Sequence, residues 1–147
     1  MANKITWSGA PTSRGTVLTT ELNTLGSAAY SGLGTEIDNT TNLDQYGACH
    51  IHLASLSPAA GAYVQLFLVQ ELASTYEQGA ASTNPGYHQS VAVMSVDTAA
   101  AAAKEIATPW FRIPPGKFKL VLYNGTGVAL GGTLNTVTLY TSDDQVN

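Results

Sequence analysis

The feature that most constrains this chain is a two-residue alternation of apolar and polar side chains in short segments that end at turn residues. In residues 48–56 the side chains of Cys49, Ile51, Leu53 and Ser55 occupy every second position, and the sequence Ser57-Pro58-Ala59-Ala60-Gly61 then breaks the pattern. Successive side chains of a β-strand point to opposite faces. The pattern therefore predicts a strand with one buried face, followed by a turn.

Further segments are predicted to be extended, because they alternate in the same way or are rich in aromatic and β-branched residues. They are residues 62–72, 90–96, 106–113, 117–123 and 137–140. The short connector favours a hairpin between residues 48–56 and 62–72. Asn124-Gly125-Thr126-Gly127 is a strong turn signal after residues 117–123. We expect a surface loop at residues 75–87 and a polar tail at residues 141–147.

These segments predict an all-β fold, an antiparallel, jelly-roll-like β-sandwich of about seven or eight strands with at most one or two short helices. Residues 1–147 form a single domain in this prediction, with residues 1–15 as a candidate extended N-terminal arm. Two segments leave the type of element open. Residues 16–25 fit one short helical face, and the alanine run 99–103 fits a short helix, a single turn or a hairpin loop.

The low charge of the chain argues against several classes of function. Charged residues make up 11% of the sequence, and the net charge is −4. Nucleic-acid binding is not expected, because phosphate groups would meet no basic stripe. The longest apolar stretch is far shorter than the roughly 20 residues that span a bilayer, so no membrane partner is expected. The single cysteine, Cys49, excludes an internal disulfide and is interpreted as a small buried hydrophobic residue.

The sequence contains no motif typical of an enzyme. Gly131-Gly132-Thr133 and Gly32-Leu33-Gly34 lack the residues that complete a phosphate-binding loop, and no Gly-x-Ser-x-Gly elbow occurs. The carboxylates are scattered. A glycosidase pair among them stays open, because separation in space is not visible in a sequence. We predict a protein that is not an enzyme and that needs no cofactor.

His50 and His52 are the strongest candidates for a metal site. Residues two apart on a strand project from one face, where two imidazoles could chelate a metal ion, and His88 could complete the site. The favoured alternative places the pair on the solvent or subunit face of a strand whose other face is buried. No metal site is therefore predicted, although the pair could make an interface sensitive to pH.

Seven tyrosines and two tryptophans raise a second possibility, an aromatic platform that binds sugars. Tyr63, Tyr123 and Tyr140 lie inside strand patterns, where packing already explains an aromatic residue. Trp110 stands next to Phe111, a pair that is typical of a core or of a subunit contact.

A series of turn and strand motifs runs through nearly the whole chain in a fixed order. The motifs are Ile5-Thr6-Trp7-Ser8, Gly15-Thr16-Val17-Leu18-Thr19-Thr20-Glu21-Leu22-Asn23, Glu36-Ile37-Asp38-Asn39, Leu56-Ser57-Pro58-Ala59-Ala60-Gly61-Ala62-Tyr63-Val64, Ile113-Pro114-Pro115-Gly116-Lys117-Phe118-Lys119 and Asn124-Gly125-Thr126-Gly127-Val128-Ala129-Leu130. This series resembles a family of small virion proteins of tailed bacteriophages. Members of that family often have no assigned role, and its better-understood relatives by style are capsid decoration, or cement, proteins with a jelly-roll-like β-sandwich.

The resemblance implies a non-enzymatic structural protein that decorates the capsid exterior and stabilises it by binding across subunits of the major capsid protein. It also implies synthesis in the host cytoplasm and self-association as a dimer or trimer. Ile5, Trp7, Trp110 and Phe111 are the interface candidates, and deletion of residues 1–6 is expected to weaken capsid binding. The alternative is a tail or head-fibre component whose sandwich binds a glycan of the host surface; a third reading is a sugar- or metal-binding enzyme domain.

Overall fold

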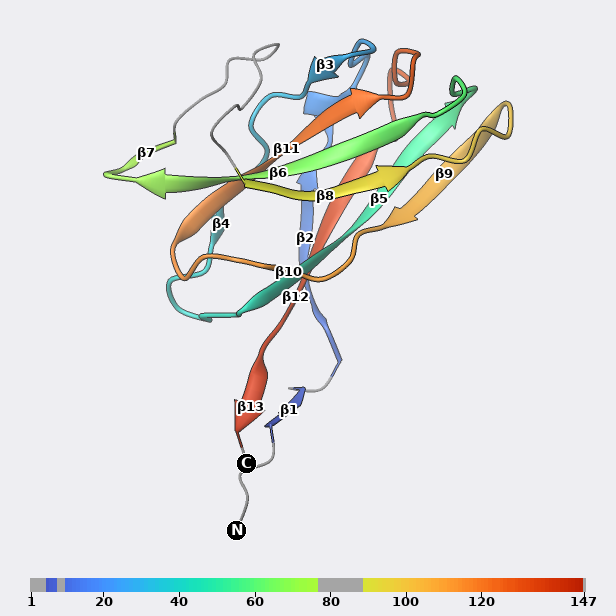
Figure 1. The fold of residues 1–147 in the computed structure, drawn as a ribbon. Helices are drawn as coiled ribbons and strands as arrows, with labels where there is room; N and C mark the ends of the chain where they lie inside the picture. Colours follow the sequence, from blue (N-terminus) through green and yellow to red (C-terminus); the bar gives the residue numbers. More distant parts are fainter. Residues whose placement is uncertain (1–4, 8–9, 77–88, 147) are drawn as a thin grey trace.

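Two antiparallel sheets pack face to face, and the strands from β2 to β12 build both of them (Figure 1). The computed structural model describes residues 5–7, 10–76 and 89–146. Within these residues the only helical element is the single 3-10 turn η1, Thr20–Leu22. The predicted all-β, jelly-roll-like sandwich is confirmed by this architecture. The described residues form more strands than the seven or eight expected, because several strands of two or three residues pair with the long ones.

The first sheet is built around the long strand β5, Tyr46–Leu56. On one side β5 pairs with β12 (Thr136–Ser142), which in turn pairs with β2 (Thr12–Leu18). On the other side it pairs with β9 (Ala102–Ala107) and β10 (Phe111–Arg112), which follow one another along the same edge of β5. We call this layer the β5 sheet.

The second layer, the β6 sheet, has β11 and β6 at its centre, and shorter strands pair with their outer edges. Its members are β6 (Tyr63–Leu72), β11 (Lys117–Gly125), β8 (Gln89–Ser95), β7 (Thr75–Tyr76), β3 (Ala29–Tyr30) and β4 (Ile37–Asp38). Strands β3 and β4 both pair with β11, whereas β7 and β8 both pair with β6.

Between β2 and β12 the chain passes from one sheet to the other six times, whereas β3 and β4, β6 to β8, and β9 and β10 follow one another within a layer. This crossing pattern corrects the expected hairpin between residues 48–56 and 62–72. Strand β5 lies in one sheet and β6 in the other, so they face each other across the core without pairing. Their short connector turns at Gly61, whose φ of +75° suits glycine, and bridges the layers.

The core fills the space between the sheets with aliphatic side chains from alternate positions. In β5 these are the predicted Cys49, Ile51 and Leu53, all of which are buried, so the predicted alternation is confirmed as far as Leu53. The pairing with β9 shifts between Leu53 and Leu56, so Leu56 is buried, whereas Ser55, predicted on the same face as Leu53, is exposed. The inward-facing side chains of β6 and β11 complete the core; they are Val64, Leu66, Leu68, Phe118, Leu120 and Leu122.

The structure shows which elements form in the two segments whose type the sequence left open, residues 16–25 and 99–103, and in the expected polar tail. Residues 12–18 are strand β2, and the 3-10 turn follows at residues 20–22. The alanine run turns at Ala101, whose φ is +51°, and then enters β9 at Ala102. Residues 141–142 end β12, and strand β13 (Asp144–Val146) lies within the expected tail.

Buried asparagines hold the loops at one end of the sandwich. The expected turn at residues 124–127 begins later, because Asn124 and Gly125 still belong to β11. The buried amide of Asn124 donates to the carbonyl oxygens of Leu25 and Val128 at 3.0 and 2.9 Å. The Asn124 side chain therefore joins the loop after η1 to the turn that follows β11.

Both ends of the chain meet in a small ribbon outside the sandwich. Strand β1, Ile5–Trp7, pairs antiparallel with β13, and Ile5 lies opposite Val146 while Trp7 lies opposite Asp144. The ribbon projects from one end of the sandwich (Figure 1). Strand β2 begins at Thr12, so the last four residues of the candidate arm 1–15 belong to the sandwich.

Candidate functional site

The outer face of the β5 sheet brings together most of the polar and aromatic candidates. Residues that pair directly across neighbouring strands share a face, so the register fixes this surface. Tyr140 of β12 lies opposite Ala48, and Thr138 lies opposite His50. On the other side of β5, Ala107 lies opposite His50. The central strand therefore presents a small side chain, Ala48, beside the large ring of Tyr140.

A bulge between β9 and β10 places Trp110 on the same surface. His50 pairs with Ala107 and Gly47 pairs with Phe111, so residues 108–110 lie opposite only Ala48 and Cys49. One extra residue on an edge strand bends the strand and redirects its side chains. Trp110 is 42% exposed, whereas its neighbour Phe111 is 7% exposed and packs in the core.

Thr108 fixes the start of this bulge. Its backbone N–H donates to the Cys49 carbonyl oxygen at 2.9 Å, and its Oγ1 accepts from the Cys49 N–H at 2.8 Å. Pro109, which follows, has no N–H to offer to the ladder. The hydroxyl of Thr108 thus accepts the Cys49 N–H in place of a backbone carbonyl of the edge strand. The next two residues therefore need not pair with β5, and the strand bulges there.

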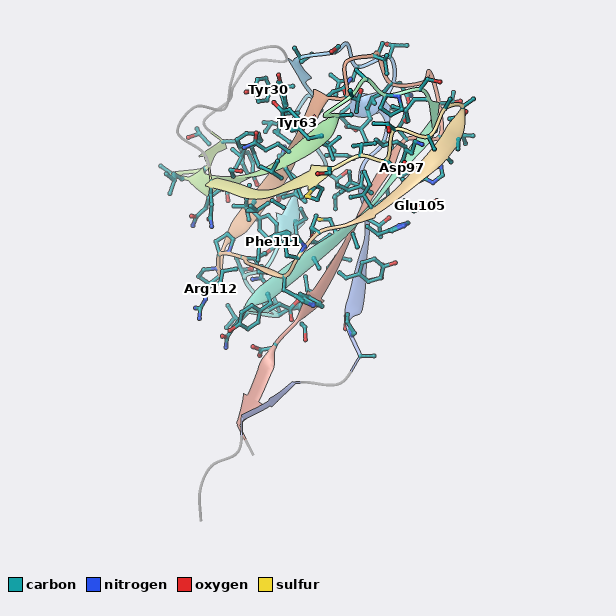
Figure 2. All side chains as sticks on the ribbon, turned by 45° about the vertical axis from the view of Figure 1, so that its right-hand side comes forward. Tyr30, Tyr63, Asp97, Glu105, Phe111 and Arg112 are labelled. Atoms are coloured by element: carbon teal, nitrogen blue, oxygen red, sulfur yellow. The ribbon has the colours of Figure 1, made fainter. Side chains whose placement is uncertain are left out.

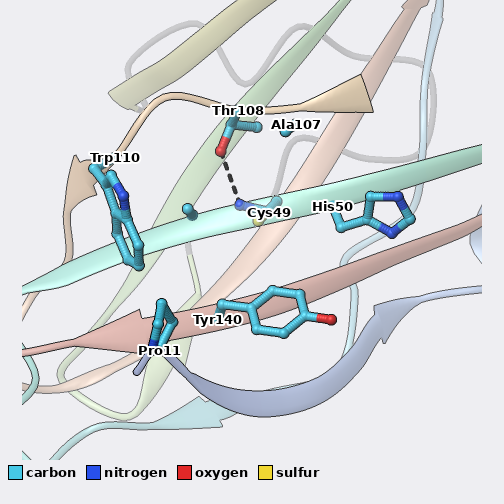
Figure 3. Close-up of a pocket in the computed structure, with 8 residues that line it drawn as sticks. Pro11, Cys49, His50, Ala107, Thr108, Trp110 and Tyr140 are labelled. Atoms are coloured by element: carbon cyan, nitrogen blue, oxygen red, sulfur yellow. Dashed lines mark hydrogen bonds between the residues drawn. The ribbon is translucent and has the colours of Figure 1, made fainter. Parts of the chain in front are cut away.

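The result is an open cleft of about 400 Å³ between Trp110 and Tyr140 (Figure 3). Pro11, which precedes β2, closes it on the side of Tyr140, and His50 lies at its far end. Ala48 lies between the two rings and leaves the space that a larger side chain would fill. The cleft is therefore a direct product of a small residue between two aromatic residues on flanking strands.

A carboxylate joins the two predicted histidines beside this cleft. Glu105 of β9 lies opposite His52, and its Oε1 is 2.6 Å from His52 Nδ1 while its Oε2 is 2.8 Å from His50 Nε2. The hydrogen bond from His52, together with the charges of both histidines, lowers the pKa of Glu105. The histidines share the exposed face, as the alternation in β5 requires.

The described residues contain no group of three or more His, Cys, Asp or Glu side chains that could hold a metal ion. In the trio above, the carboxylate lies between the imidazoles and occupies one ring nitrogen of each. His88, the third candidate, lies outside the described residues. Burial raises the pKa of the Cys49 thiol to about 12, so this cysteine stays protonated at neutral pH and is a poor nucleophile.

The other outer face, that of the β6 sheet, carries a second cluster of aromatic residues. The rings of Tyr30 and Tyr123 lie 4.7 Å apart between centroids, and those of Tyr63 and Tyr123 lie 5.8 Å apart. Figure 2 shows Tyr30 and Tyr63 close together on this layer. Tyr30 and Tyr123 pack over the cluster that contains Phe67 and cover the sheet there. The three tyrosine rings are tilted against one another, so they do not form one flat platform.

The predicted site residues thus fall into three places. Trp110, His50 and His52 share the outer face of the β5 sheet, Phe111 lies in the core, and Ile5 and Trp7 lie in the terminal ribbon. Three contributors to the open face were not singled out as site residues: Glu105, Tyr140 and Ala48. Only the strand register, which the sequence does not contain, brings them together.

Comparison with known proteins adds no family to these observations. No protein-family model matches the chain, and no curated protein matches it. Among the described residues, no helix has the length and apolar character needed to cross a membrane.

Proposed function

We propose that this chain is a non-enzymatic structural protein of a tailed-bacteriophage virion, which decorates the capsid exterior and stabilises it by binding across subunits of the major capsid protein. The motif series that resembles small virion proteins supports the proposal, and so does the jelly-roll-like sandwich. The observation that carries it is the terminal ribbon.

The ribbon has too little structure to be stable by itself. Strands β1 and β13 have three residues each and form a sheet that is separate from both layers of the sandwich. An isolated two-stranded sheet is marginally stable in water, and its outer edges present unpaired N–H and C=O groups. A strand of another protein that pairs with such an edge would supply the missing hydrogen bonds. A subunit of the capsid is the proposed source of that strand.

The composition of the chain suits this role. Many copies on one shell make modest contacts effective, because each copy is held at several places and the contacts act together. Charged residues are only 11% of the sequence, which reduces the cost of removing charges from water when a surface is buried. Self-association as a dimer or trimer would add contacts between neighbouring copies.

The number of copies per particle tests the proposal. Purified particles of the phage that encodes this chain would be analysed by quantitative mass spectrometry and by cryo-electron microscopy. Decoration predicts a copy number close to that of the major capsid protein, or a simple fraction of it, with density on the shell lattice. A few copies confined to the tail or to single vertices would contradict decoration and would support the tail or head-fibre alternative.

Deletion of residues 1–6 tests the role of the ribbon. The truncated protein should keep the melting temperature of the sandwich, because the core is built by residues from β2 onward. Its binding to shells that lack the protein should fall strongly in a co-sedimentation assay. Replacement of residues 1–6 by a Gly/Ser segment of equal length is the matched control and should give the same loss. Normal decoration by the truncated protein would refute a role for the ribbon.

A further inference from the structure

We propose that the cleft between Trp110 and Tyr140 is a binding site for a neutral hexose glycan. This inference goes beyond capsid decoration, because it concerns the outer face of the β5 sheet and not the ribbon. It rests on the shape of the cleft, on the polar group at its edge and on the charge of its lining.

The shape fits a sugar ring. The cleft measures about 400 Å³, which lies in the range of roughly 300–1,000 Å³ that small-ligand sites occupy. Trp110 and Tyr140 project from opposite sides of Ala48, and Pro11 adds a third flat apolar ring. The C–H faces of a hexose are apolar and bury well against aromatic side chains, whose polar atoms can also reach hydroxyl groups.

The edge of the cleft offers hydrogen bonds to hydroxyl groups. His50 lines the cleft, and its Nε2 is 2.8 Å from Glu105 Oε2. A carboxylate has about four lone-pair positions, so Glu105 can accept from sugar hydroxyls while it remains bonded to both histidines. The side chain of Glu105 is more than half exposed, which leaves it accessible to a ligand that extends past His50.

The charge of the lining selects against anionic ligands. The lining contains no lysine or arginine, and Glu105 adds a negative charge beside it. A sialylated or sulfated glycan, or a nucleotide, would need basic side chains to bind its anionic groups. Proline-rich peptides also dock on aromatic grooves, but they bind mainly by apolar contact and would leave the His50–Glu105 pair unused. The observations favour an uncharged hexose oligomer.

Titration of the full chain followed by ¹H–¹⁵N NMR tests this site. The probes are maltohexaose, cellohexaose and a proline decamer. The proposal predicts saturable shifts of the Trp110 indole signal and of the Ala48 and Tyr140 amides with at least one of the two sugars. The Trp110 signal is assigned by comparison with Trp7→Phe. Shifts with neither sugar, or shifts with the proline decamer alone, would overturn the proposal.

Variants separate binding in the cleft from general effects. Trp110→Ala removes one wall of the cleft, and Ala48→Phe fills the space between the two rings. Each variant should raise the dissociation constant for the sugar at least tenfold, which corresponds to about 1.4 kcal/mol of binding free energy. Leu134→Ala is the control, because Leu134 is 74% exposed and does not line the cleft. Should Trp110→Ala fail to fold, Ala48→Phe alone decides. Unchanged sugar affinity in folded Ala48→Phe would refute the site.

The same variants distinguish this site from the proposed capsid role. Ala48→Phe should lose sugar binding and keep binding to shells, whereas deletion of residues 1–6 should do the reverse. Loss of capsid binding in the deletion variant with intact sugar binding would show that the two surfaces act separately. Loss of both activities in Ala48→Phe would contradict the assignment of the cleft to a glycan alone.

Discussion

The two outer faces of the sandwich differ in what covers them. On the β6 sheet, the outward side chains of Phe67, Val69 and Val121 are buried beneath Tyr30, Leu33, Tyr76 and Tyr123. On the β5 sheet, the corresponding outward positions of the central strand carry Ala48, His50 and His52, and no layer of side chains from the described chain buries them. One face is completed within the chain, and the other is left accessible to a ligand or a partner.

This difference is visible in the sequence patterns of the two central strands. Strand β6 contains a continuous apolar run at residues 66–69, which is typical of a strand buried on both faces. Strand β5 alternates between buried and more exposed residues from Tyr46 to Leu53, which is typical of a strand buried on one face. Sequence alone thus separates a strand that is covered on both faces from one with an open outer face, although it does not show what covers the first.

The largest expected effect comes from truncation of the covered face. Phe67→Ala removes a buried ring that packs on Tyr30, and it should reduce the free energy of unfolding by about 3–5 kcal/mol. Tyr140→Ala, on the open face, is the matched change and should cost far less, because its ring is only partly buried. Urea denaturation of both variants measures the difference. Equal losses would mean that the two faces are equally covered.

A smaller effect is expected at Gly34. This residue follows the covering residue Leu33, at a point where the chain contacts both sheets. The Gly34 N–H donates to the Leu120 carbonyl oxygen at 3.0 Å, and a Cβ at Gly34 would overlap the Val17 carbonyl oxygen and the Leu18 side chain. Gly34→Ala should therefore destabilise the protein by roughly 1–3 kcal/mol. Gly26→Ala is the control, since a Cβ there meets no atom within 4 Å. A neutral Gly34→Ala in thermal denaturation would show that this segment can move away.

The smallest effect concerns one carboxylate on each face. The hydrogen bond from Tyr76 and then that from Lys117 lower the pKa of Glu36, and the hydrogen bond from His52 lowers the pKa of Glu105. A lowered pKa stabilises the fold above the unfolded value of 4.5, and this contribution is lost as the pH falls through the folded value. Both groups are exposed, so each contribution is small.

Glu36→Gln and Glu105→Gln should each reduce the loss of melting temperature between neutral pH and about pH 3. The wild-type protein and the double variant, measured by circular dichroism in the same buffers, complete the comparison. A steeper acid loss in either single variant would contradict the stated direction of the pKa shift.

The sequence predicted the class of the fold and the alternation in β5. Burial of one face of a strand requires an apolar residue at every second position, and this local pattern can be recognised without knowing the partner strands. It did not predict the partner of β5. The hairpin prediction for residues 48–56 and 62–72 used the length of the connector, but a connector of this length can also cross from one sheet to the other when both strands have an apolar inner face. Pairing depends on residues far away in the chain, such as β12.

The candidate site was predictable only where residue type or local spacing marks a residue. Trp110 stood out by its residue type, and His50 and His52 by their spacing. The cleft itself depends on Ala48, which lacks any distinguishing chemistry, and on a bulge of one residue at Thr108–Trp110. A single change of register would move Tyr140 away from Ala48, so no local pattern could show that these residues meet.

The meeting of both chain ends in one ribbon has a practical consequence for labelling the protein. A fluorescent protein or peptide joined to either end of these 147 residues emerges at the same end of the molecule, beside β1 and β13. Cargo fused there would compete for space with a strand of the capsid protein that pairs with the ribbon, as proposed above. The connection between β5 and β6 lies at the far end of the sandwich (Figure 1), and Gly61 at its tip is open to solvent. An insertion at that connection would display a foreign peptide outward while both ends remain available.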